Sequence, residues 1–265
     1  MGKNIFTFTS IKTLVMLYIL LAISASILIY SAVMVNSITH QKSVNYDNHF
    51  RYHIANDCFR QGADLLTEAV RRYVVTMKPE YIEAYFHEAL VERHRDRALE
   101  MIRDMQISQS LKDSLAYAMK SSDSLMDTEY HAMHLIALKS DNETLHREVK
   151  EYPLTPEEEK MTIDQRHDLA EHLLWDNEYV KNKADIYSYL VRGLEEASAQ
   201  SMKRHLKLRK ELLHTLFLGA VSLTALVLSI CGFIFYRRVQ HEHMMEEQAK
   251  ENARMNAELK EEHSR

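Results

Sequence analysis

Histidine is the residue type in this sequence with the most chemistry to offer, because 15 of the 265 residues are His. His131 and His134 lie three positions apart in the run EYHAMH, a spacing that can place two imidazoles on one metal ion if the run is helical. His167, Glu171 and His172 form a second group. Solvated or interhelical histidines explain the same pairs without a metal, so both interpretations stay open.

Proton binding is the other chemistry that so many imidazoles could serve. Histidine titrates in the environmental pH range, and a pH-sensing role is therefore a further hypothesis.

Catalysis by this chain has little support from its motifs. The sequence contains no Gly-x-Ser-x-Gly, His-Glu-x-x-His, P-loop or Cys cluster. It has only 5 Gly and 3 Pro, whereas phosphate loops and tight turns depend on these residues. A net charge of −5 argues against a general nucleic-acid binder, which would show a basic domain or stripe. We therefore expect long helices, no cofactor, no nucleic acid and no enzymatic activity in this chain.

Two blocks without Asp, Glu, Lys or Arg, residues 13–39 and 215–236, are long enough to cross a bilayer, which takes roughly 20 apolar residues. The first follows Lys12 and is longer than the roughly 7 to 15 residues of a secretory apolar core, which predicts an uncleaved anchor. Arg237 and Arg238 follow the second block directly, as in a stop-transfer segment.

The topology that these flanks predict has both termini in the cytoplasm, with Lys12, Arg237 and Arg238 at the membrane interface. The basic run between Lys203 and Lys210, on the other flank of the second block, argues against it. Cys231 would lie in the membrane and Cys58 outside it, so the two cannot pair within one chain. Cys58 is then either a small buried hydrophobe or the site of a disulfide to a second subunit.

The residues between the two blocks show helical periodicity nearly throughout. The first helix is expected to continue from the membrane to Met77, with its inward face formed by Ala55, Cys58, Leu65, Leu66, Ala69, Val70 and Tyr73. Pro79 is expected to begin a second helix that continues to a turn at 106–109. A third helix is predicted from Ser110 to near Asp141.

The last helical region is expected to begin at Thr155, Pro156 and Glu158, which supply a cap, a first-turn proline and a capping-box acid. A short helix to Trp175 and a long helix from 177 into the second apolar block follow. The predicted fold is all-α, with two transmembrane helices flanking an antiparallel extracytoplasmic bundle of four long helices and a helical coil at the C-terminus. The predicted segments are a cytoplasmic N-terminus (1–12), transmembrane helices at 13–36 and 215–236, an extracytoplasmic helical domain (37–214) and a cytoplasmic tail (237–265).

Four features carry a resemblance to a known family: LLTEAVRRYVVT (65–76), the spaced Tyr81 and Tyr85 with Glu88, SLMDTEYHAMHLI (124–136) and LTPEEEKMTIDQRHDLAEHLLWDNEYVKNKADI (154–186). They resemble the extracytoplasmic sensor region of two-pass bacterial histidine kinases and diguanylate cyclases. The resemblance covers roughly 54–194 and both apolar blocks. It implies a homodimer in the bacterial cytoplasmic membrane that binds an unknown extracytoplasmic ligand.

Two departures from that family are visible. Such proteins usually show Gly-Asp where this chain has Met77 and Lys78, which leaves the turn between the first two helices without its expected cap. The resemblance also implies a cytoplasmic kinase or cyclase domain, whereas the residues after Arg238 form a charged, weakly heptad-like tail without a phosphoacceptor motif, ATP lid or cyclase loop.

Within the resembling stretches and the helix that Pro79 begins, six residues could line a ligand pocket between helices: Arg71, Tyr81, Tyr85, Glu88, Glu129 and Tyr130. Tyrosines at four-residue spacing also form ordinary core with their hydroxyls at its edge, so a packing role is the alternative.

The first functional hypothesis is a membrane-bound sensor that transmits an extracytoplasmic stimulus to a cytoplasmic output not present in this chain. The alternative is a non-enzymatic adaptor or scaffold that recruits a separate signalling protein through its C-terminal coil.

Overall fold

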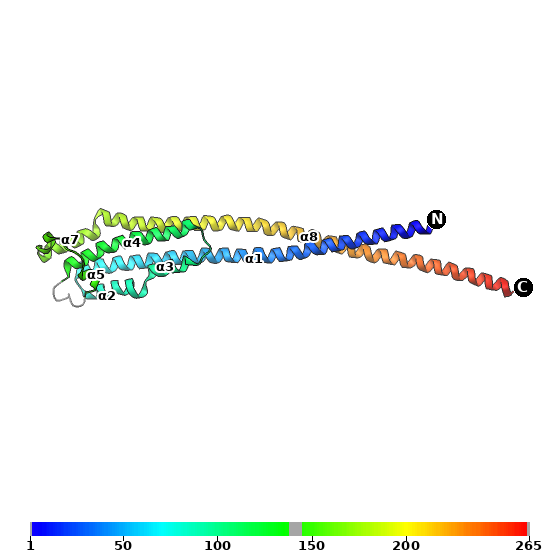
Figure 1. The fold of residues 1–265 in the computed structure, drawn as a ribbon, viewed down its shortest axis with the longest axis horizontal. Coiled ribbons are helices and arrows are strands. Elements are labelled where there is room, and N and C mark those ends of the chain that lie inside the picture. The colour runs from blue at the N-terminus through cyan, green and yellow to red at the C-terminus, as the bar shows by residue number, and fades with distance from the viewer. Residues whose placement is uncertain (1, 138–144, 264–265) are drawn as a thin grey trace. The chain divides into compact units, whose positions relative to one another are not determined.

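The computed structural model describes residues 2–137 and 145–263, and every regular element in these residues is a helix (Figure 1). The all-α prediction is therefore confirmed. The elements are α1 (Gly2–Thr76), α2 (Pro79–His87), the π-helical turn η1 (Glu88–Glu92), α3 (His94–Arg103), α4 (Gln109–Ile136), α5 (Arg147–Lys150), α6 (Pro156–Glu159), α7 (Ile163–Trp175) and α8 (Asn177–His263). The predicted continuation of the third helix towards Asp141 lies outside the described residues.

The chain divides into two compact units, one formed by Met1–Lys42 with Leu206–Arg265 and the other by Ser43–His205. The helices α1 and α8 each contribute residues to both units. Each of these two helices contains a segment that is long and apolar enough to cross a membrane.

In the first unit, the apolar segments of α1 and α8 contact each other through small side chains. The Ser222 hydroxyl donates a hydrogen bond to the Ser24 carbonyl at 2.5 Å. A Cβ placed on Gly219 would lie 3.4 Å from the Ser31 Cβ, and one placed on Gly232 would lie 3.6 Å from Leu17. Small residues at these positions allow the two backbones to approach closely.

The second unit, 43–205, has one hydrophobic core to which α1, α2, α3, α4, α5, α7 and α8 contribute side chains. Most of the inward face predicted for α1 is buried there, including Ala55, Val70 and Tyr73. Leu65 is the exception, since it is 44% exposed while Leu66 is 2% exposed. Adjacent helical residues point about 100° apart because a turn takes about 3.6 residues, so only one of this pair can face the core.

The helix predicted from Pro79 to the turn at 106–109 is interrupted, and the prediction of one continuous helix is wrong there. The chain forms α2, the π-helical turn and α3, and Arg93 between them is left-handed with φ 51°. The Glu88 carboxylate accepts the backbone N–H of His94 at 3.0 Å and lies 2.7 Å from the His94 ring nitrogen Nδ1. Glu88 thus takes up a free N–H group in the first turn of α3, which stabilises the break.

The signals around Pro156 are largely confirmed. The Thr155 hydroxyl and the Glu158 carboxylate form the predicted capping box at the start of α6. A second capping box between Thr162 and Gln165, which was not predicted, begins α7 and divides the expected short helix into two. The helix boundary between Trp175 and Asn177 lies where the sequence placed it.

The turn between α1 and α2 departs from the usual geometry of a non-glycine residue. Helix α1 ends at Thr76, and Met77 adopts a left-handed conformation with φ 54° while its N–H bonds the Tyr73 carbonyl at 2.7 Å. This is the position where the resembling family has glycine, the residue that accepts such a conformation without strain. Lys78 supplies no side-chain cap to α2.

Candidate functional site

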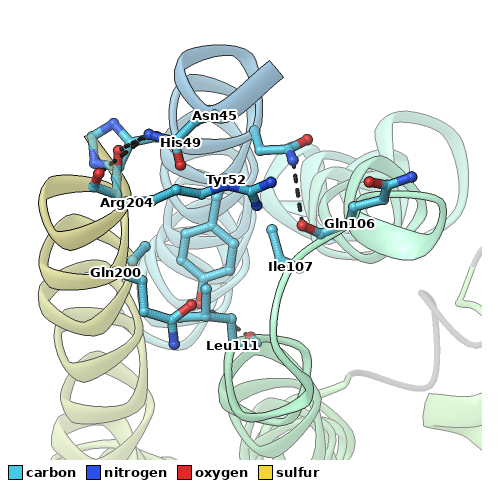
Figure 2. Close-up of a pocket in the computed structure, with 11 residues that line it drawn as sticks. Asn45, His49, Tyr52, Gln106, Ile107, Leu111, Gln200 and Arg204 are labelled. Carbon is cyan, nitrogen blue, oxygen red and sulfur yellow. Dashed lines mark hydrogen bonds between the residues drawn. The ribbon is translucent and has the colours of Figure 1, made fainter. Parts of the chain in front are cut away.

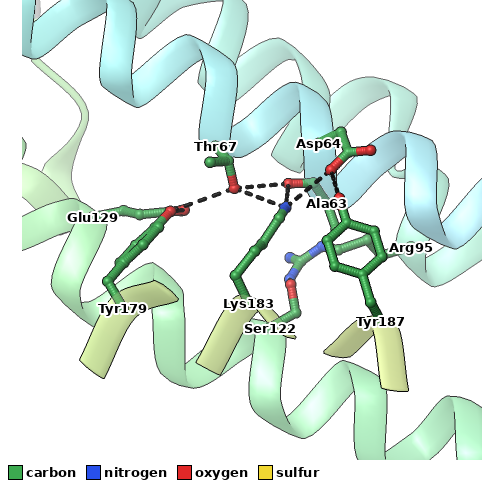
Figure 3. Close-up of polar contacts among 9 residues, drawn as sticks. All are labelled: Ala63, Asp64, Thr67, Arg95, Ser122, Glu129, Tyr179, Lys183 and Tyr187. Atoms are coloured by element: carbon green, nitrogen blue, oxygen red, sulfur yellow. Dashed lines mark hydrogen bonds and ion pairs between the residues drawn. The ribbon is translucent and has the colours of Figure 1, made fainter. Parts of the chain in front are cut away.

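The core of the 43–205 unit contains a carboxylate, Glu129 of α4, which is only 2% exposed (Figure 3). Its oxygen Oε2 accepts a hydrogen bond from the Tyr85 hydroxyl of α2 at 2.7 Å, and its Oε1 accepts one from the Tyr179 hydroxyl of α8 at 2.6 Å. Burial raises the pKa of Glu129, although the two phenol donors oppose that shift. Burial and the nearby Glu129 charge raise the pKa of both tyrosines, so both remain protonated donors.

Next to this carboxylate, Lys183 of α8 lies against α1. Its Nζ donates to the Ala63 carbonyl at 2.7 Å and to the Thr67 hydroxyl at 2.9 Å, and it lies 3.2 Å from the Asp64 carboxylate. The Tyr187 hydroxyl donates to the same Asp64 carboxylate. Burial lowers the pKa of Lys183, while the charge of Asp64 opposes the shift. Figure 3 shows these side chains meeting between α8 and α1.

Thr67 connects the two groups of contacts, because its hydroxyl also lies 3.4 Å from the Tyr179 hydroxyl. A series of polar contacts therefore leads from the buried Glu129 through Tyr179 and Thr67 to Lys183 and Asp64. Asp64 is at the protein surface, with about half of its side chain (47%) exposed.

That surface end forms a groove between α1 and α8 with a volume of about 810 Å³, within the size range of small-molecule sites. The groove is lined by Asp57, Arg60, Gln61, Asp64, Leu65, Thr67, Glu68, Arg71, Lys183 and Tyr187. Three of these residues are cations and three are carboxylates.

The carboxylates of the groove each have a cationic partner. Asp64 pairs with Lys183 at 3.2 Å, and the other two carboxylates pair along their own helix, Asp57 with Arg60 at 3.5 Å and Glu68 with Arg72 at 2.6 Å.

Arg71 differs from the other cations of the groove. Its Nη2 donates to the Leu174 carbonyl at the end of α7 at 2.8 Å, and its guanidinium lies over the rings of Trp175 and Tyr179 at 4.9 and 5.3 Å. No carboxylate pairs with it among the described residues, and its buried Nε has no hydrogen-bond partner there. Arg71 therefore brings to the groove a positive charge that no carboxylate neutralises among the described residues, which suits a ligand that carries a negative charge.

The six residues predicted to line a pocket are divided by the structure between two places. Arg71, Tyr85 and Glu129 come together around Tyr179, and Tyr130 packs with its ring centroid 6.0 Å from that of Tyr85. That these residues bind a ligand stays a prediction.

Tyr81 and Glu88 instead line a separate groove of about 350 Å³ between α1 and α2, with Arg72 lying 5.8 Å from the Tyr81 ring. The two predicted residues therefore do not belong to the groove that contains Arg71.

Sequence reasoning missed Asp64, Lys183 and Tyr187. A signal for them was present, because Tyr179, Lys183 and Tyr187 recur at four-residue steps and so share one face of α8. A lysine between two tyrosines on a core-facing stripe needs a partner, and Asp64 on α1 supplies it.

The two histidines predicted as a metal pair have other partners. The His131 Nε2 lies 3.0 Å from the Glu158 carboxylate, and the His134 Nδ1 lies 2.7 Å from the Tyr152 carbonyl. In the second group, His167 Nε2 lies 2.9 Å from the Val74 carbonyl. Within the described residues, no group of three or more His, Cys, Asp or Glu side chains could hold a metal ion, so the pair has no third ligand there.

The two cysteines are free thiols in this chain. Cys58 packs half-buried against the core, and its Sγ lies 3.3 Å from the His94 carbonyl. This contact fits the buried-hydrophobe interpretation, while a disulfide to a second subunit stays a hypothesis. At the predicted membrane interface, Arg238 pairs with Glu242 at 3.3 Å along α8.

No protein-family model, curated protein or solved structure matches this chain.

Proposed function

We propose that the protein is a sensor of the bacterial cytoplasmic membrane that passes an extracytoplasmic stimulus to a cytoplasmic output. One observation carries the proposal. The helices α1 and α8 are each unbroken, each contains an apolar segment of membrane-spanning length, and the same two helices line the groove of the 43–205 unit. A ligand held between them would act directly on the two elements that continue into the membrane.

The surface of the apolar segments supports their place in a bilayer. Large hydrophobic side chains are strongly exposed there, including Met16 (72%), Leu228 (71%) and Phe235 (70%). Such a surface costs free energy in water and none in hydrocarbon. With Lys12 before the first segment and Arg237 and Arg238 after the second, we propose that both termini are cytoplasmic.

Between the two membrane crossings, the 43–205 unit would be the sensor domain, an antiparallel bundle of the four-helix type. Its polar series from Glu129 to Lys183 joins α1, α4 and α8, so a ligand that competes for Lys183 or Arg71 would change the contacts between these helices. Helix shifts of about 1 to 2 Å are typical of such transitions. The stimulus would leave through the tail of α8 to a histidine kinase or diguanylate cyclase, and this chain would itself have no enzymatic activity.

The proposal is tested by fixing α1 to α8 and observing the tail. In the full chain, Cys58→Ser and Cys231→Ser first remove the native thiols. His49→Cys on α1 and Ser198→Cys on α8 then introduce a new pair, at positions whose side chains lie 3.3 Å apart. A short bifunctional thiol reagent then bridges them in nanodiscs. A photocrosslinking amino acid in place of Met245 reports the surroundings of the tail, and bridging should change its crosslinks.

The matched control carries Ser188→Cys and Arg192→Cys, both on α8 and joined within one helix. The same reagent reacts there without tying α8 to α1, so the tail crosslinks should stay as they are. An identical tail pattern in the bridged and unbridged forms of the test variant would contradict transmission through these helices.

The adaptor hypothesis is favoured by one separate feature. Met244, Met245 and Met255 are more than half exposed on the charged tail of α8 and could form a docking face for another helix. If position 245 crosslinks to a separate protein, and these crosslinks do not change when α1 and α8 are bridged, the result would support an adaptor over a sensor.

A further inference from the structure

A second, smaller pocket lies in the 43–205 unit, where α1, α8 and the connection between α3 and α4 meet (Figure 2). Its volume is about 80 Å³. The lining residues are Asn45, Asn48, His49, Tyr52, Gln106, Ile107, Leu111, Ala197, Gln200, Ser201 and Arg204. Neither the sensor groove nor the motifs of the sequence include this pocket.

The walls of the pocket are held in place by hydrogen bonds between the elements that form it. Asn45 of α1 donates to the Ser201 hydroxyl of α8 at 3.1 Å, and Asn48 donates to the Gln106 carbonyl at 3.3 Å. The Tyr52 hydroxyl donates to the Leu111 carbonyl at the start of α4 at 3.1 Å. The pocket is thus built by residues of three separate segments.

The charge of the lining is one-sided. Arg204 carries the only permanent charge among the lining residues, and no carboxylate is one of them. The nearby Glu196 lies outside the lining. Its carboxylate accepts hydrogen bonds from the Ser110 hydroxyl and, at 2.8 Å, from the Gln200 amide. In Figure 2 the Arg204 side chain extends from α8 towards the middle of the pocket.

Free donors accompany this charge. Within the described part of the chain, the Arg204 guanidinium has no hydrogen bond or ion pair, and the Gln106 side-chain amide has no hydrogen bond. The Ser201 hydroxyl accepts from Asn45 and keeps its own proton to donate. A guanidinium with neutral N–H and O–H donors around it, and without a competing carboxylate, is the donor set that an oxyanion requires.

We propose that this pocket binds a small oxyanion, either free in solution or as the headgroup of an anionic lipid. Size limits the ligand, because about 80 Å³ holds a phosphate-sized group but not the larger molecules that occupy pockets of roughly 300 Å³ and more. The anion would bridge Arg204 of α8 to Gln106 in the α3–α4 connection. That it acts as a stimulus rests on the proposed sensor function, whereas the binding itself does not.

The experiment uses the full chain in phosphatidylcholine nanodiscs at constant ionic strength. Isothermal titration calorimetry with phosphate, sulfate, nitrate and acetate measures free anions. Native mass spectrometry counts the phosphatidylglycerol that the chain retains from mixed nanodiscs. The test variant is Arg204→Gln, and the matched control is Lys203→Gln, which removes the same charge from the neighbouring position outside the lining.

At least one of these anions is expected to bind with one site per chain. Arg204→Gln should weaken that binding roughly tenfold or more, as loss of charge-assisted hydrogen bonds predicts, while Lys203→Gln should change it less than about twofold. Retention of one phosphatidylglycerol that Arg204→Gln alone abolishes would identify the lipid headgroup as the source of the oxyanion.

Two results would overturn the proposal: neither a free anion nor phosphatidylglycerol binds the unsubstituted chain, or both variants weaken binding equally. Both measurements are independent of the tail crosslinks. Binding without any response of the tail to bridging would therefore leave the anion site standing and remove the sensor function.

Discussion

Tyr179 of α8 donates a 2.6 Å hydrogen bond to Glu129 of α4 in the buried centre of the 43–205 unit. With the second donor, Tyr85, this contact satisfies a carboxylate that has almost no access to water. Burial nevertheless outweighs the two donors, since the pKa of Glu129 is raised. Ionisation of Glu129 therefore weakens the fold, which gives the protein a measurable dependence on pH.

Glu129→Gln should remove the part of the pH dependence that Glu129 causes. The pKa of Glu129 is higher in the folded chain than in the unfolded chain, where the carboxyl has its ordinary pKa of 4.5. The stability that this proton contributes is complete below 4.5 and is lost as the pH rises through the raised folded pKa. Unfolding of the full chain is followed by circular dichroism from about pH 4 to 8. As the pH rises, the free energy of unfolding of Glu129→Gln should increase relative to that of the original chain.

Glu83→Gln on α2 is the control for that measurement, because Glu83 is exposed. The stability of the Glu83→Gln variant should follow that of the original chain at every pH. Parallel curves for the original chain and Glu129→Gln would show that Glu129 keeps the same pKa on unfolding, contrary to this prediction.

Met77→Gly should stabilise the chain. Met77 has φ 54°, and the left-handed region costs an L-residue about 1 to 2 kcal/mol. Glycine has no such cost, but it loses more backbone freedom on folding, so the net gain should be about 0.5 to 1 kcal/mol in chemical denaturation. Thr76→Gly, one residue earlier and still helical, should instead destabilise by a similar amount. A loss of stability in Met77→Gly would mean that its side chain makes a contact worth more than the strain.

Two helix starts were predictable because their signals are local. Pro79 begins α2 and the Thr155–Glu158 capping box begins α6 because a first-turn proline and a reciprocal cap act within one turn of the chain. The break at Arg93 was not predictable in this way. It depends on Glu88 reaching the start of α3, where the buried Arg95 guanidinium bonds the Ser122 hydroxyl of α4 at 2.7 Å.

The residues of the candidate site were likewise predicted only in part. Tyr85 and Glu129 were singled out in the sequence because they lie in the motifs that carry the family resemblance, and the structure joins them by a hydrogen bond. Lys183 was missed because a lysine on a helix is ordinarily solvated, and its burial follows only once α1 brings Asp64 against it. The pairing of α1 with α8 joins residues from opposite ends of the domain sequence, which periodicity within one helix cannot reveal.

The proposed topology predicts opposite labelling of two engineered cysteines. In a chain with Cys58→Ser and Cys231→Ser, Asp57→Cys would lie in the extracytoplasmic domain and Glu247→Cys in the cytoplasmic tail, and both positions are exposed. A membrane-impermeant maleimide added to intact cells should label the first cysteine and not the second. Cell lysis should make both react. Labelling of position 247 in intact cells would place the tail outside and reverse the proposed orientation.

Gly193 of α8 provides the most direct test of how α8 packs on α1 and α4. Helix propensity alone makes Gly→Ala favourable by about 1 kcal/mol. At Gly193, however, a Cβ would overlap the Tyr52 hydroxyl of α1 and would lie 3.2 Å from the Ser114 Cβ of α4. Gly193→Ala should therefore destabilise the chain, by about 1 to 3 kcal/mol in chemical denaturation, as overpacking does.

Tyr52→Phe removes the atom that the new methyl group would meet, so it should rescue Gly193→Ala. Its own cost should be small, about 1 kcal/mol, because the Leu111 carbonyl that Tyr52 bonds lies within α4. The double variant should then be more stable than Gly193→Ala alone, although each substitution separately destabilises. Additive losses would mean that Gly193 and Tyr52 are not in contact, so the packing of α1 against α8 described above would be wrong around these two residues.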